Sequence, residues 1–439
     1  MKKIVKDFRK ELLRTDVVPR KLNEVSLKYK EMFLEDLKSG KIKTEEVVKC
    51  QCGGSNLEQL ARIDRFGLPF GSLICQDCGL VITSPRIVEE SLPYYYDTYY
   101  HPLNYGREDL ENQTALFADG QGKKIFSILK EYLPQKKKLK ILEVGAGTGN
   151  VLAEFKSEAK QHDIEIDELG TEYSNDCILK ARKDNNINII FGNAETIVKR
   201  NEKFDVIILS HVFEHFIDLN KELNNLKKLM TNDSLLYIEV PGIMVNHKKH
   251  YYDFSFLYYL THAHIYNFTK TTLSNILYLN GMKSIFSNEE VFSVSILNTN
   301  NIKYKIKNDY FSTLKYLECL VNDQDYFKQL YFYKKQYFSQ QKTIKNRENT
   351  IKGKEFLISK MQKELQKQEI FINKQQNTIK NRENTIKGKD YLLDILSGSI
   401  EEINSYSLIT NPLKKYKAYK NMLMNFYKIK RKLKNESKN

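Results

Sequence analysis

The segment LKILEVGAGTGN (139–150) decides the fold class of this chain. An apolar strand runs directly into three glycines, Gly145, Gly147 and Gly149, and the residues after them, VLAEFKSEA (151–159), are typical of a helix. Glycines let a ligand approach the backbone closely, and the first turn of a helix leaves N–H groups without partners. The pattern predicts a strand, a ligand-binding turn and a helix.

Strands and helices alternate outward from this segment. Such alternation is typical of a parallel sheet covered by helices on both faces, so we predict an α/β, Rossmann-like doubly wound domain. The further strands are predicted at 166–172, 187–192, 204–210, 235–240 and 291–297, and helices at 115–133 and 271–281.

Acidic and amide side chains stand at the ends of the predicted strands. Glu143 precedes the glycines, where a carboxylate suits an amino group of a cationic ligand; Glu172 closes the next strand and suits ribose hydroxyls. Asn193 follows the third strand and suits an adenine edge. Thr171 or Glu168 is an alternative to Glu172, because the spacing from the last glycine is long. An NAD-binding sheet has similar glycines, so that alternative stays open here.

Together these residues resemble class I S-adenosylmethionine-dependent methyltransferases over residues 139–297. The family usually has aspartate where this chain has Asn193, but an amide also donates and accepts hydrogen bonds. The resemblance implies that the cofactor-binding residues are Glu143, Gly145 and Gly147 for the methionine part, with Gly149 in the same turn, Glu172 for the ribose, Asn193 for the adenine, and Ser210 at the end of the fourth strand.

Four of the six cysteines lie in two close pairs. The second pair, CQDCG (75–79), is typical of a zinc knuckle, whereas the first, CQCG (50–53), is one residue shorter. Four thiolates in two pairs suit a tetrahedral structural zinc ion, and reduced core thiols are the alternative. The predicted zinc ligands are Cys50, Cys52, Cys75 and Cys78, whereas Cys177 and Cys319 are predicted to be ordinary buried residues.

The segment CQDCGLVITSPRIVEESLPYYYDTYY (75–100) narrows the resemblance to methyltransferases with an N-terminal zinc-binding module that act on sugars, often in surface-polysaccharide or deoxysugar pathways. SHVFEHF (210–216) and THAHIYNFTKTTLSNILYLNGM (261–282) are similar to segments of that family. The resemblance implies O-methylation of a nucleotide sugar or a surface glycan, with C-methylation as a variant. The tyrosines of 94–100 are expected to cover the cofactor, to line the sugar site or to pack in the core.

Histidines beyond the fourth strand are candidates for the base that removes the acceptor proton. We expect His215 to be this base, with Glu214 orienting it and His211 one helical turn earlier on the same face. His262 and His264 come from a later loop and are expected to close over the same cleft. A purely structural histidine is the alternative. The H-x-x-E-H pattern of metalloproteases is rejected, because the motif sits in a strand-to-helix loop.

The basic charge of the chain is confined to its last third. The 439 residues carry a formal charge of +15, but residues 301–439 hold 30 basic against 14 acidic side chains, which leaves 40 against 41 in residues 1–300. The balance in the front part argues against a nucleic-acid groove there, and nucleic acid is an unlikely partner. An RNA methyltransferase remains the alternative enzyme.

The C-terminal part has a repeat and a basic tail. TIKNRENTIKGK (343–354) recurs at 378–389 with an offset of five heptads, which predicts a weak coiled coil and a homo-oligomer, or a long exposed helix. A non-catalytic coiled-coil scaffold is therefore a further alternative. The tail is expected either to contact an anionic membrane surface or to act as a solubilising segment.

No signal peptide or apolar stretch of about 18 residues is recognisable, so a cytoplasmic protein is expected, with a possible peripheral place at the inner face of the membrane. We predict five segments. They are a helical segment at 1–49, a zinc-binding module with a tyrosine-rich linker at 50–106, the methyltransferase domain at 107–305, a helical or coiled-coil region at 306–400 and a basic amphipathic tail at 401–439.

Overall fold

The computed structural model describes residues 7–108, 120–299 and 304–348, together with 366–370, 373–374, 424 and 428. The chain divides into two compact units, Met1–Lys335 and Gln336–Asn439. Every strand that the structure describes lies in the first unit. Among the described helices, none combines the length and the apolar character that crossing a lipid bilayer requires.

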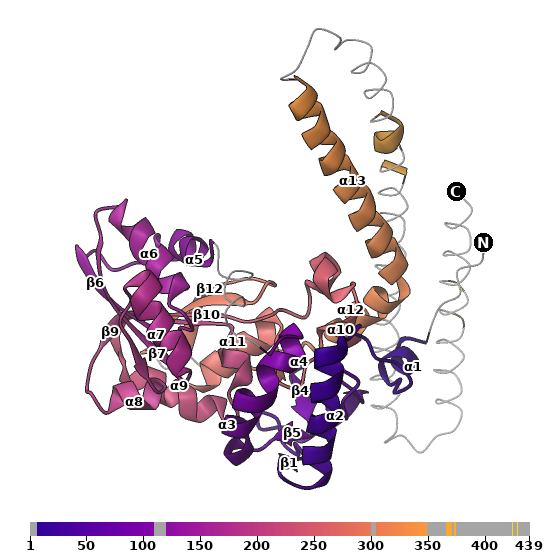
Figure 1. Cartoon of the computed structure of the whole chain (residues 1–439), viewed down its shortest axis with the longest axis horizontal. Coiled ribbons are helices and arrows are strands. Elements are labelled where there is room, and N and C mark those ends of the chain that lie inside the picture. Colours follow the sequence, from indigo (N-terminus) through magenta and orange to yellow (C-terminus); the bar gives the residue numbers. More distant parts are fainter. Residues whose placement is uncertain are drawn as a thin grey trace. The chain divides into compact units, whose positions relative to one another are not determined.

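A seven-stranded sheet in the order β12-β13-β10-β9-β6-β7-β8 forms the centre of the first unit (Figure 1). Strands β10, β9, β6, β7 and β8 are parallel neighbours, whereas β13 runs antiparallel to both β10 and β12. The sheet confirms the predicted Rossmann-like α/β fold and adds strand β12, which was not predicted. The bounds are β6 (Lys138–Val144), β7 (Glu165–Glu172), β8 (Ile189–Phe191), β9 (Phe204–Ser210), β10 (Met230–Glu239), β12 (Met282–Ser287) and β13 (Phe292–Leu297).

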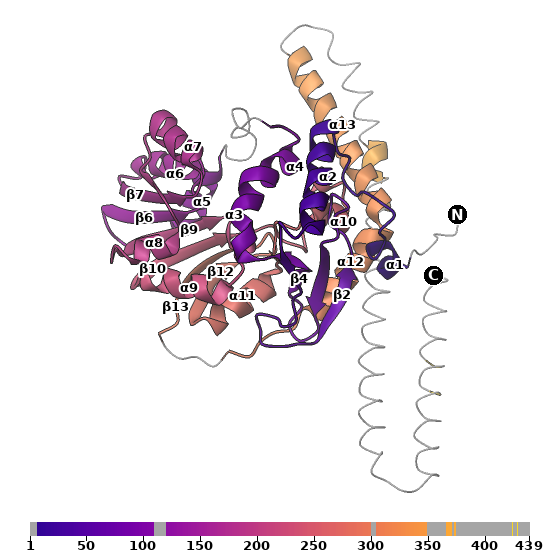
Figure 2. The ribbon, with the colours of Figure 1, turned by 60° about the horizontal axis from the view of Figure 1, so that its bottom comes forward.

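Helices cover both faces of this sheet (Figure 2). Two separate apolar clusters form as a result, one on each face. The chain passes from β6 to β7 and β8 on one side and then to β9 and β10 on the other, so the strand order reverses between β6 and β9. Doubly wound sheets bind ligands outside the carboxyl ends of the strands at this point, which is named here the crevice. One face carries α5 (Gln121–Leu129), α6 (Asn150–Lys160) and α7 (Asn175–Lys180), and the other carries α8 (Ala194–Val198), α9 (Leu219–Lys228) and α11 (Lys270–Leu279).

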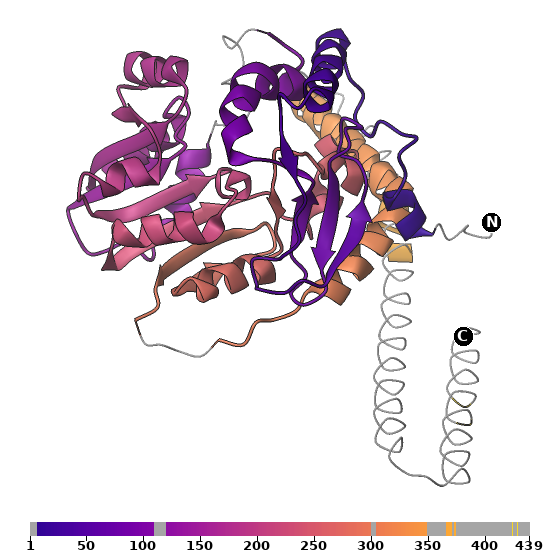
Figure 3. The same ribbon diagram turned by 90° about the horizontal axis from the view of Figure 1, so that it is seen from below.

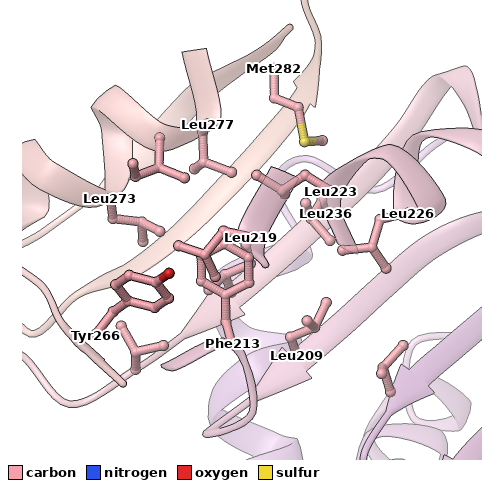
Figure 4. Packing of buried hydrophobic residues seen from close by; sticks show 14 of the residues in the cluster. Leu209, Phe213, Leu219, Leu223, Leu226, Leu236, Tyr266, Leu273, Leu277 and Met282 are labelled. Atoms are coloured by element: carbon pink, nitrogen blue, oxygen red, sulfur yellow. The ribbon is translucent and has the colours of Figure 1, made fainter. Parts of the chain in front are cut away.

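The apolar stripe of α9 explains how one face is closed. Leu219, Leu223 and Leu226 recur at helical spacing, and each is at most 1% exposed. Burying each side chain contributes about 1.5–3 kcal/mol. Figure 4 shows the packed side chains of this cluster, including Leu209, Phe213, Leu236, Tyr266, Leu273, Leu277 and Met282.

A second sheet, in the order β11-β4-β3-β2, lies beside the first and contains the cysteine segment (Figure 3). Its strands are antiparallel, and β11 comes from a part of the chain that follows β10. Leu80 and Ile82 belong to the same apolar cluster as α9 and α11. The cysteine segment is therefore packed on the larger sheet. The bounds are β2 (Leu57–Ala61), β3 (Gly71–Cys75), β4 (Val81–Ser84) and β11 (Tyr266–Asn267), and a separate pair is formed by β1 (Thr44–Glu45) and β5 (Arg86–Ile87).

The N-terminal helices pack on a buried aromatic group. Tyr95 and Tyr99 are at most 1% exposed, and the ring of Phe33 lies 5.6 Å and 5.0 Å from theirs. These tyrosines therefore have the core role that was one of the expectations for 94–100. The short helices here are α1 (Phe8–Leu12), α2 (Glu24–Lys38), α3 (Leu92–Tyr95), α4 (His101–Tyr105) and α10 (Phe256–Tyr259), with a π-helical turn η2 (Tyr96–Tyr100).

Helices α12 (Tyr310–Asn322) and α13 (Gln324–Glu348) follow the larger sheet. Most of the heptad segment and of the tail 401–439 lies outside the described residues, so the coiled coil and the membrane contact stay predictions. Cys319 on α12 is exposed and Cys177 is only half-buried. The expectation that both are ordinary buried residues is therefore wrong.

Candidate functional site

The three glycines form a tight turn between β6 and α6. Their φ angles are +72° at Gly145, +51° at Gly147 and +74° at Gly149, a region that favours glycine. Gly149 is also the N-cap of α6. A Cβ at Gly145 would lie 2.6 Å from Val212, whereas a Cβ at Gly147 would meet no atom within 4 Å. The turn thus presents bare backbone to the crevice at Gly147.

The two acidic residues predicted near this turn lie beside it. Glu172 accepts a hydrogen bond from the Gly147 backbone N–H at 3.0 Å, and its other oxygen accepts from Tyr173 and Ser174. Glu143 is 2% exposed, and its Oε2 has no hydrogen-bond partner among the residues that the structure describes. Burial, together with the charge of Glu172, raises the pKa of the Glu143 carboxyl well above its usual value.

The other cofactor candidates have distinct positions. Asn193 caps α8, because its side-chain oxygen accepts from the Thr196 backbone N–H at 3.2 Å. This leaves its amide N–H groups for other partners. Of the two alternatives to Glu172, Glu168 pairs with Lys156, and the Thr171 side chain is fully buried. Neither side chain hydrogen-bonds the glycine turn as Glu172 does, although the backbone carbonyl of Thr171 accepts from the Ala146 N–H at 2.9 Å.

A polar group on the other side of the crevice was not predicted. Glu239, at the end of β10, accepts hydrogen bonds from Gln121 at 2.7 Å and Lys124 at 2.6 Å. Gln121 also donates to the hydroxyl of Ser210 at 3.3 Å. Helix α5 thus joins the ends of β9 and β10. The position of Glu239 at the end of a predicted strand was a usable signal, whereas nothing local marks Gln121.

Two aromatic side chains near Glu172 were also missed. Tyr173 follows β7 and Phe191 ends β8, and they are 61% and 56% exposed. Their rings meet edge to face with centroids 5.6 Å apart. The place of Tyr173 directly after the predicted strand 166–172 was a usable signal, whereas Phe191 lies inside the predicted strand 187–192 and was not marked in this way.

Glu214 is the centre of a group of histidines beyond β9. Its side chain is 1% exposed, and Oε1 lies 3.7 Å from Nδ1 of His211 and 3.9 Å from Nε2 of His215. His211 has a φ of +57°, and only Phe213–His215 form a single short turn. The prediction that His211 and His215 share a helical face is therefore wrong. The buried carboxylate, and not a helix, brings them together.

The orientation of His215 differs from the expected one. Its Nδ1 lies 2.8 Å from the carbonyl oxygen of Ala263 and 3.2 Å from the hydroxyl of Tyr96. A carbonyl only accepts, so a neutral ring donates from Nδ1 and keeps a lone pair on Nε2. Burial lowers the pKa of His215 below its usual value, so this ring is neutral at pH 7. At 3.9 Å Glu214 makes no hydrogen bond to it, and the Ala263 carbonyl holds the ring instead.

The two later histidines separate in the structure. His264 joins the group, with Nε2 at 4.0 Å from the Glu214 carboxylate. His262 does not, because it is buried against Asp64, with 2.6 Å between Nδ1 and Oδ2, and stacks on Phe33. The expectation that His262 closes over the cleft is therefore wrong.

The small sheet holds the loop that orients His215. The backbone N–H of Thr83 on β4 donates to the carbonyl oxygen of Ile265 at 2.9 Å. The Thr83 hydroxyl donates to the carbonyl oxygen of His264 at 2.6 Å. Ile265 in turn donates to the carbonyl of Glu214 at 2.9 Å. A short chain of hydrogen bonds therefore connects the cysteine-bearing sheet to the histidine group.

The four cysteines form a compact cluster. Cys50 and Cys78 have their sulfurs 3.6 Å apart, and Cys52 and Cys75 have theirs 3.7 Å apart. All four sulfurs lie within 4.8 Å of one another. Zn–S bonds of about 2.3 Å in a tetrahedron place sulfurs about 3.8 Å apart, so the donor set fits such an ion. Backbone N–H groups of Gly54 and Leu80 point at two sulfurs, as in a knuckle.

Comparisons with known proteins agree with this arrangement at the level of the domain. Residues 117–285 match the family model described as a methyltransferase domain. No curated protein matches the chain.

Solved structures also match part of the chain. A SAM-dependent methyltransferase from Archaeoglobus fulgidus is 23% identical over 39% of this chain and 75% of its own, with a TM-score of 0.29. The YcgJ protein from Bacillus subtilis is 14% identical over 37% of this chain and 71% of its own, with a TM-score of 0.29. The plantazolicin methyltransferase BpumL, solved with SAH, is 18% identical over 52% of this chain and 84% of its own, with a TM-score of 0.32. These values are too low to bear on the substrate.

Proposed function

We propose that this chain, in which residues 117–285 form a methyltransferase domain that uses S-adenosylmethionine, methylates a hydroxyl group of a sugar. The acceptor would be a nucleotide-activated monosaccharide or a surface glycan, with oxygen favoured over carbon as the attacking atom. The observation that carries the proposal is His215, a neutral histidine whose Nε2 keeps a lone pair. It belongs to the segment after β9, and Val212 of that segment lies against Gly145 of the glycine turn.

The residues around the glycine turn fit the donor. Glu143 offers a buried carboxyl that is unpaired at Oε2 among the described residues, which suits an ammonium group, and Gly147 leaves room for close approach. Glu172 would exchange its backbone contacts for ribose hydroxyls, and the Asn193 amide would donate to the adenine. The bound donor would supply a methyl group on a positively charged sulfur, which is already a good leaving group.

His215 would act on the acceptor. As the acceptor oxygen forms its bond to the methyl carbon and the carbon–sulfur bond breaks, the hydroxyl proton would pass to Nε2 of His215. The hydrogen bond from Nδ1 to Ala263 fixes the ring for this transfer. The nearby Glu214 carboxylate would stabilise the resulting imidazolium.

Three observations support a sugar as the acceptor. The first is the resemblance of residues 75–100 to methyltransferases that act on sugars. The rings of Tyr96 and Tyr100 lie 6.4 Å and 6.3 Å from that of His215, and aromatic faces suit the apolar faces of sugars. The balanced charge of residues 1–300 does not favour a polyanionic acceptor. We further propose that Cys50, Cys52, Cys75 and Cys78 hold a structural zinc ion, because their sulfur spacing fits one.

A labelled methyl-transfer assay tests the acceptor. The purified chain is incubated with labelled S-adenosylmethionine and a panel of nucleotide sugars, extracted glycans and RNA, and products are read by mass spectrometry. Label on a sugar oxygen is the expected result. Label on RNA, with a steep loss of binding as salt rises, would overturn the sugar proposal and favour the RNA alternative.

Gly147→Ala is expected to abolish tight donor binding with little harm to the fold. The new Cβ meets no protein atom within 4 Å, so it would occupy space that we assign to the donor. The positive φ alone should lower the free energy of unfolding by about 1–2 kcal/mol. Calorimetry with S-adenosylhomocysteine should show at least a tenfold loss of affinity.

Gly40→Ala is the matched control for this variant. Gly40 also has a positive φ, +75°, with open space around its Cβ position, and it follows α2 far along the chain from the glycine turn. It should show the same loss of stability and unchanged affinity. Equal affinity of both variants for S-adenosylhomocysteine would contradict the placement of the donor.

Donor binding is expected to strengthen as pH rises. The raised pKa of Glu143 means that its carboxyl is protonated below that pKa and must lose the proton before it can pair with an ammonium group. Affinity should therefore rise up to about tenfold per pH unit and flatten above the pKa. Calorimetry in buffers of different ionisation enthalpy should detect proton release, and Glu143→Gln should bind weakly and without that release.

A further inference from the structure

The group formed by Glu214, His215, His264 and His211, named here the Glu214 cluster, has features that a proton-transfer site alone does not explain. Its members come from the segment after β9 and from the loop before β11. The side chains of Glu214, His215 and His264 are 1%, 17% and 13% exposed, whereas that of His211 is 52% exposed. Three of the four side chains are thus largely buried, and His211 is the one that solvent reaches.

The Glu214 carboxylate is buried, and the ring of His211, with Nδ1 3.7 Å from Oε1, can pair with it only when that ring is protonated. Neither of its oxygens has a hydrogen-bond partner among the residues that the structure describes, and the same holds for Nδ1 of His264. A buried carboxylate without hydrogen bonds is strongly disfavoured unless a proton or a cation lies beside it. A metal ion is one way to supply that positive charge.

The tautomer of His215 is a second reason to expect a cation or a proton beside Glu214. Because its Nδ1 donates to Ala263, its Nε2 carries a lone pair, and this lone pair faces the Glu214 oxygen at 3.9 Å. Two acceptors that face each other in a buried site repel unless a cation or a proton lies between them. A metal ion binds to the free lone pair of a neutral imidazole in the same way.

We infer that Glu214, His215 and His264 form a second metal site, one for a divalent transition-metal ion such as Zn²⁺. One candidate ligand atom from each residue lies within 4.8 Å of the other two. Bonds of about 2.0–2.2 Å to imidazole and carboxylate place neighbouring donors about 3.0–3.5 Å apart, so the three ligand atoms must draw together from separations of up to 4.8 Å to close the site. Two imidazoles and one carboxylate suit Zn²⁺, Fe²⁺ or Co²⁺ rather than Mg²⁺.

His211 lies beside this site but outside the three-residue group. Its Nδ1 is 3.7 Å from the same Glu214 oxygen, and its side chain is 52% exposed. The ion would occupy the Nε2 lone pair that the proposed base uses, so an ion and the acceptor proton compete for His215. This competition rests on the proposed function, whereas the site itself does not.

Counting bound ions in the full chain tests the site. The purified chain is saturated with Zn²⁺, freed of excess ion by gel filtration and analysed by elemental mass spectrometry. Two ions per chain are expected, one at the four cysteines and one at the Glu214 cluster. His264→Gln should retain one ion, and His162→Gln, a change at an exposed histidine after α6, should retain two.

Cobalt distinguishes the two sites by their donors. Added Co²⁺ that binds the Glu214 cluster should give visible ligand-field bands without the thiolate-to-metal charge-transfer absorption that a cysteine site produces. If the one ion that His264→Gln retains gives the thiolate-to-metal charge-transfer absorption when it is Co²⁺, the cysteine site of this variant is intact. Only one ion in the wild-type chain, or a second ion that persists in His264→Gln, would overturn the inference. A failure to methylate sugars would leave these ion counts unchanged.

Discussion

Replacement of His215 by alanine is expected to lower kcat for methyl transfer by about 10²–10⁴-fold, the usual contribution of a general base. The ring is held by its Nδ1 bond to Ala263, and its Nε2 is the acceptor that we assign to the substrate proton. The donor contacts that we propose lie at the ends of β6 and β7 and do not involve His215. Binding of S-adenosylhomocysteine should therefore stay within a few-fold of wild type in calorimetry.

A graded series of acceptors separates this role from a structural one. The loss of rate in His215→Ala should shrink for acceptor hydroxyls of lower pKa, because they need less help in losing the proton. His162→Ala removes an exposed histidine between α6 and β7, at the opposite edge of the sheet, and should keep wild-type rates. A loss that is equal for all acceptors and runs parallel to weaker donor binding would assign His215 to packing alone.

Loss of the zinc ion that we propose at the four cysteines is expected to have the largest effect on stability. Cys78→Ser should lower the free energy of unfolding by several kcal/mol, because metal binding contributes directly to the folding of such loop-rich segments. Cys78 is 1% exposed and lies in the apolar cluster that α9 and α11 share. Thermal unfolding followed by circular dichroism, with zinc content measured in parallel, tests this expectation.

In the same variant, methyl transfer should fall more than donor binding does. The small sheet holds Ile265 and His264 through Thr83, and this loop supplies the Ala263 carbonyl that orients His215. We expect transfer to fall at least tenfold while calorimetry still detects S-adenosylhomocysteine. Cys177→Ser, at a half-buried cysteine outside the cluster, should leave both unchanged. Full activity of a zinc-free chain would contradict the proposed coupling.

Much of the larger sheet was predictable because its signals are local. The glycines of 145–149 and the apolar runs before and after them mark strands and a turn within a few residues. The same is true of the paired cysteines, whose spacing alone indicated the cluster that the structure forms. Strand β12 was missed because its six residues, Met282–Ser287, are only partly buried and carry a weak apolar pattern.

The arrangement of the histidines could not be predicted from local sequence signals. A spacing of four residues suggested a helical face for His211 and His215, but the left-handed φ of His211 breaks the helix at its first residue. His262 and His264 are two residues apart, yet one faces Asp64 in the aromatic core and the other faces Glu214. An extended backbone would place residues i and i+2 on the same side, but residues 262 and 263 lie in a turn in which the His264 backbone N–H donates to the Thr261 carbonyl at 3.0 Å. This turn sends the two rings to different sides, and the packing decides which of them reaches Glu214.

The amino-acid sequence by itself determined the α/β class, the position of the glycine turn, the acidic strand ends and the cysteine pairs, because each depends on periodicity or chemistry within a short window. Tertiary structure alone decided that β11 pairs with β4, that Gln121 and Lys124 bind Glu239, and that Ala263 holds His215. These contacts join residues that are far apart along the chain. Their formation depends on how whole elements pack, which no single window of sequence contains.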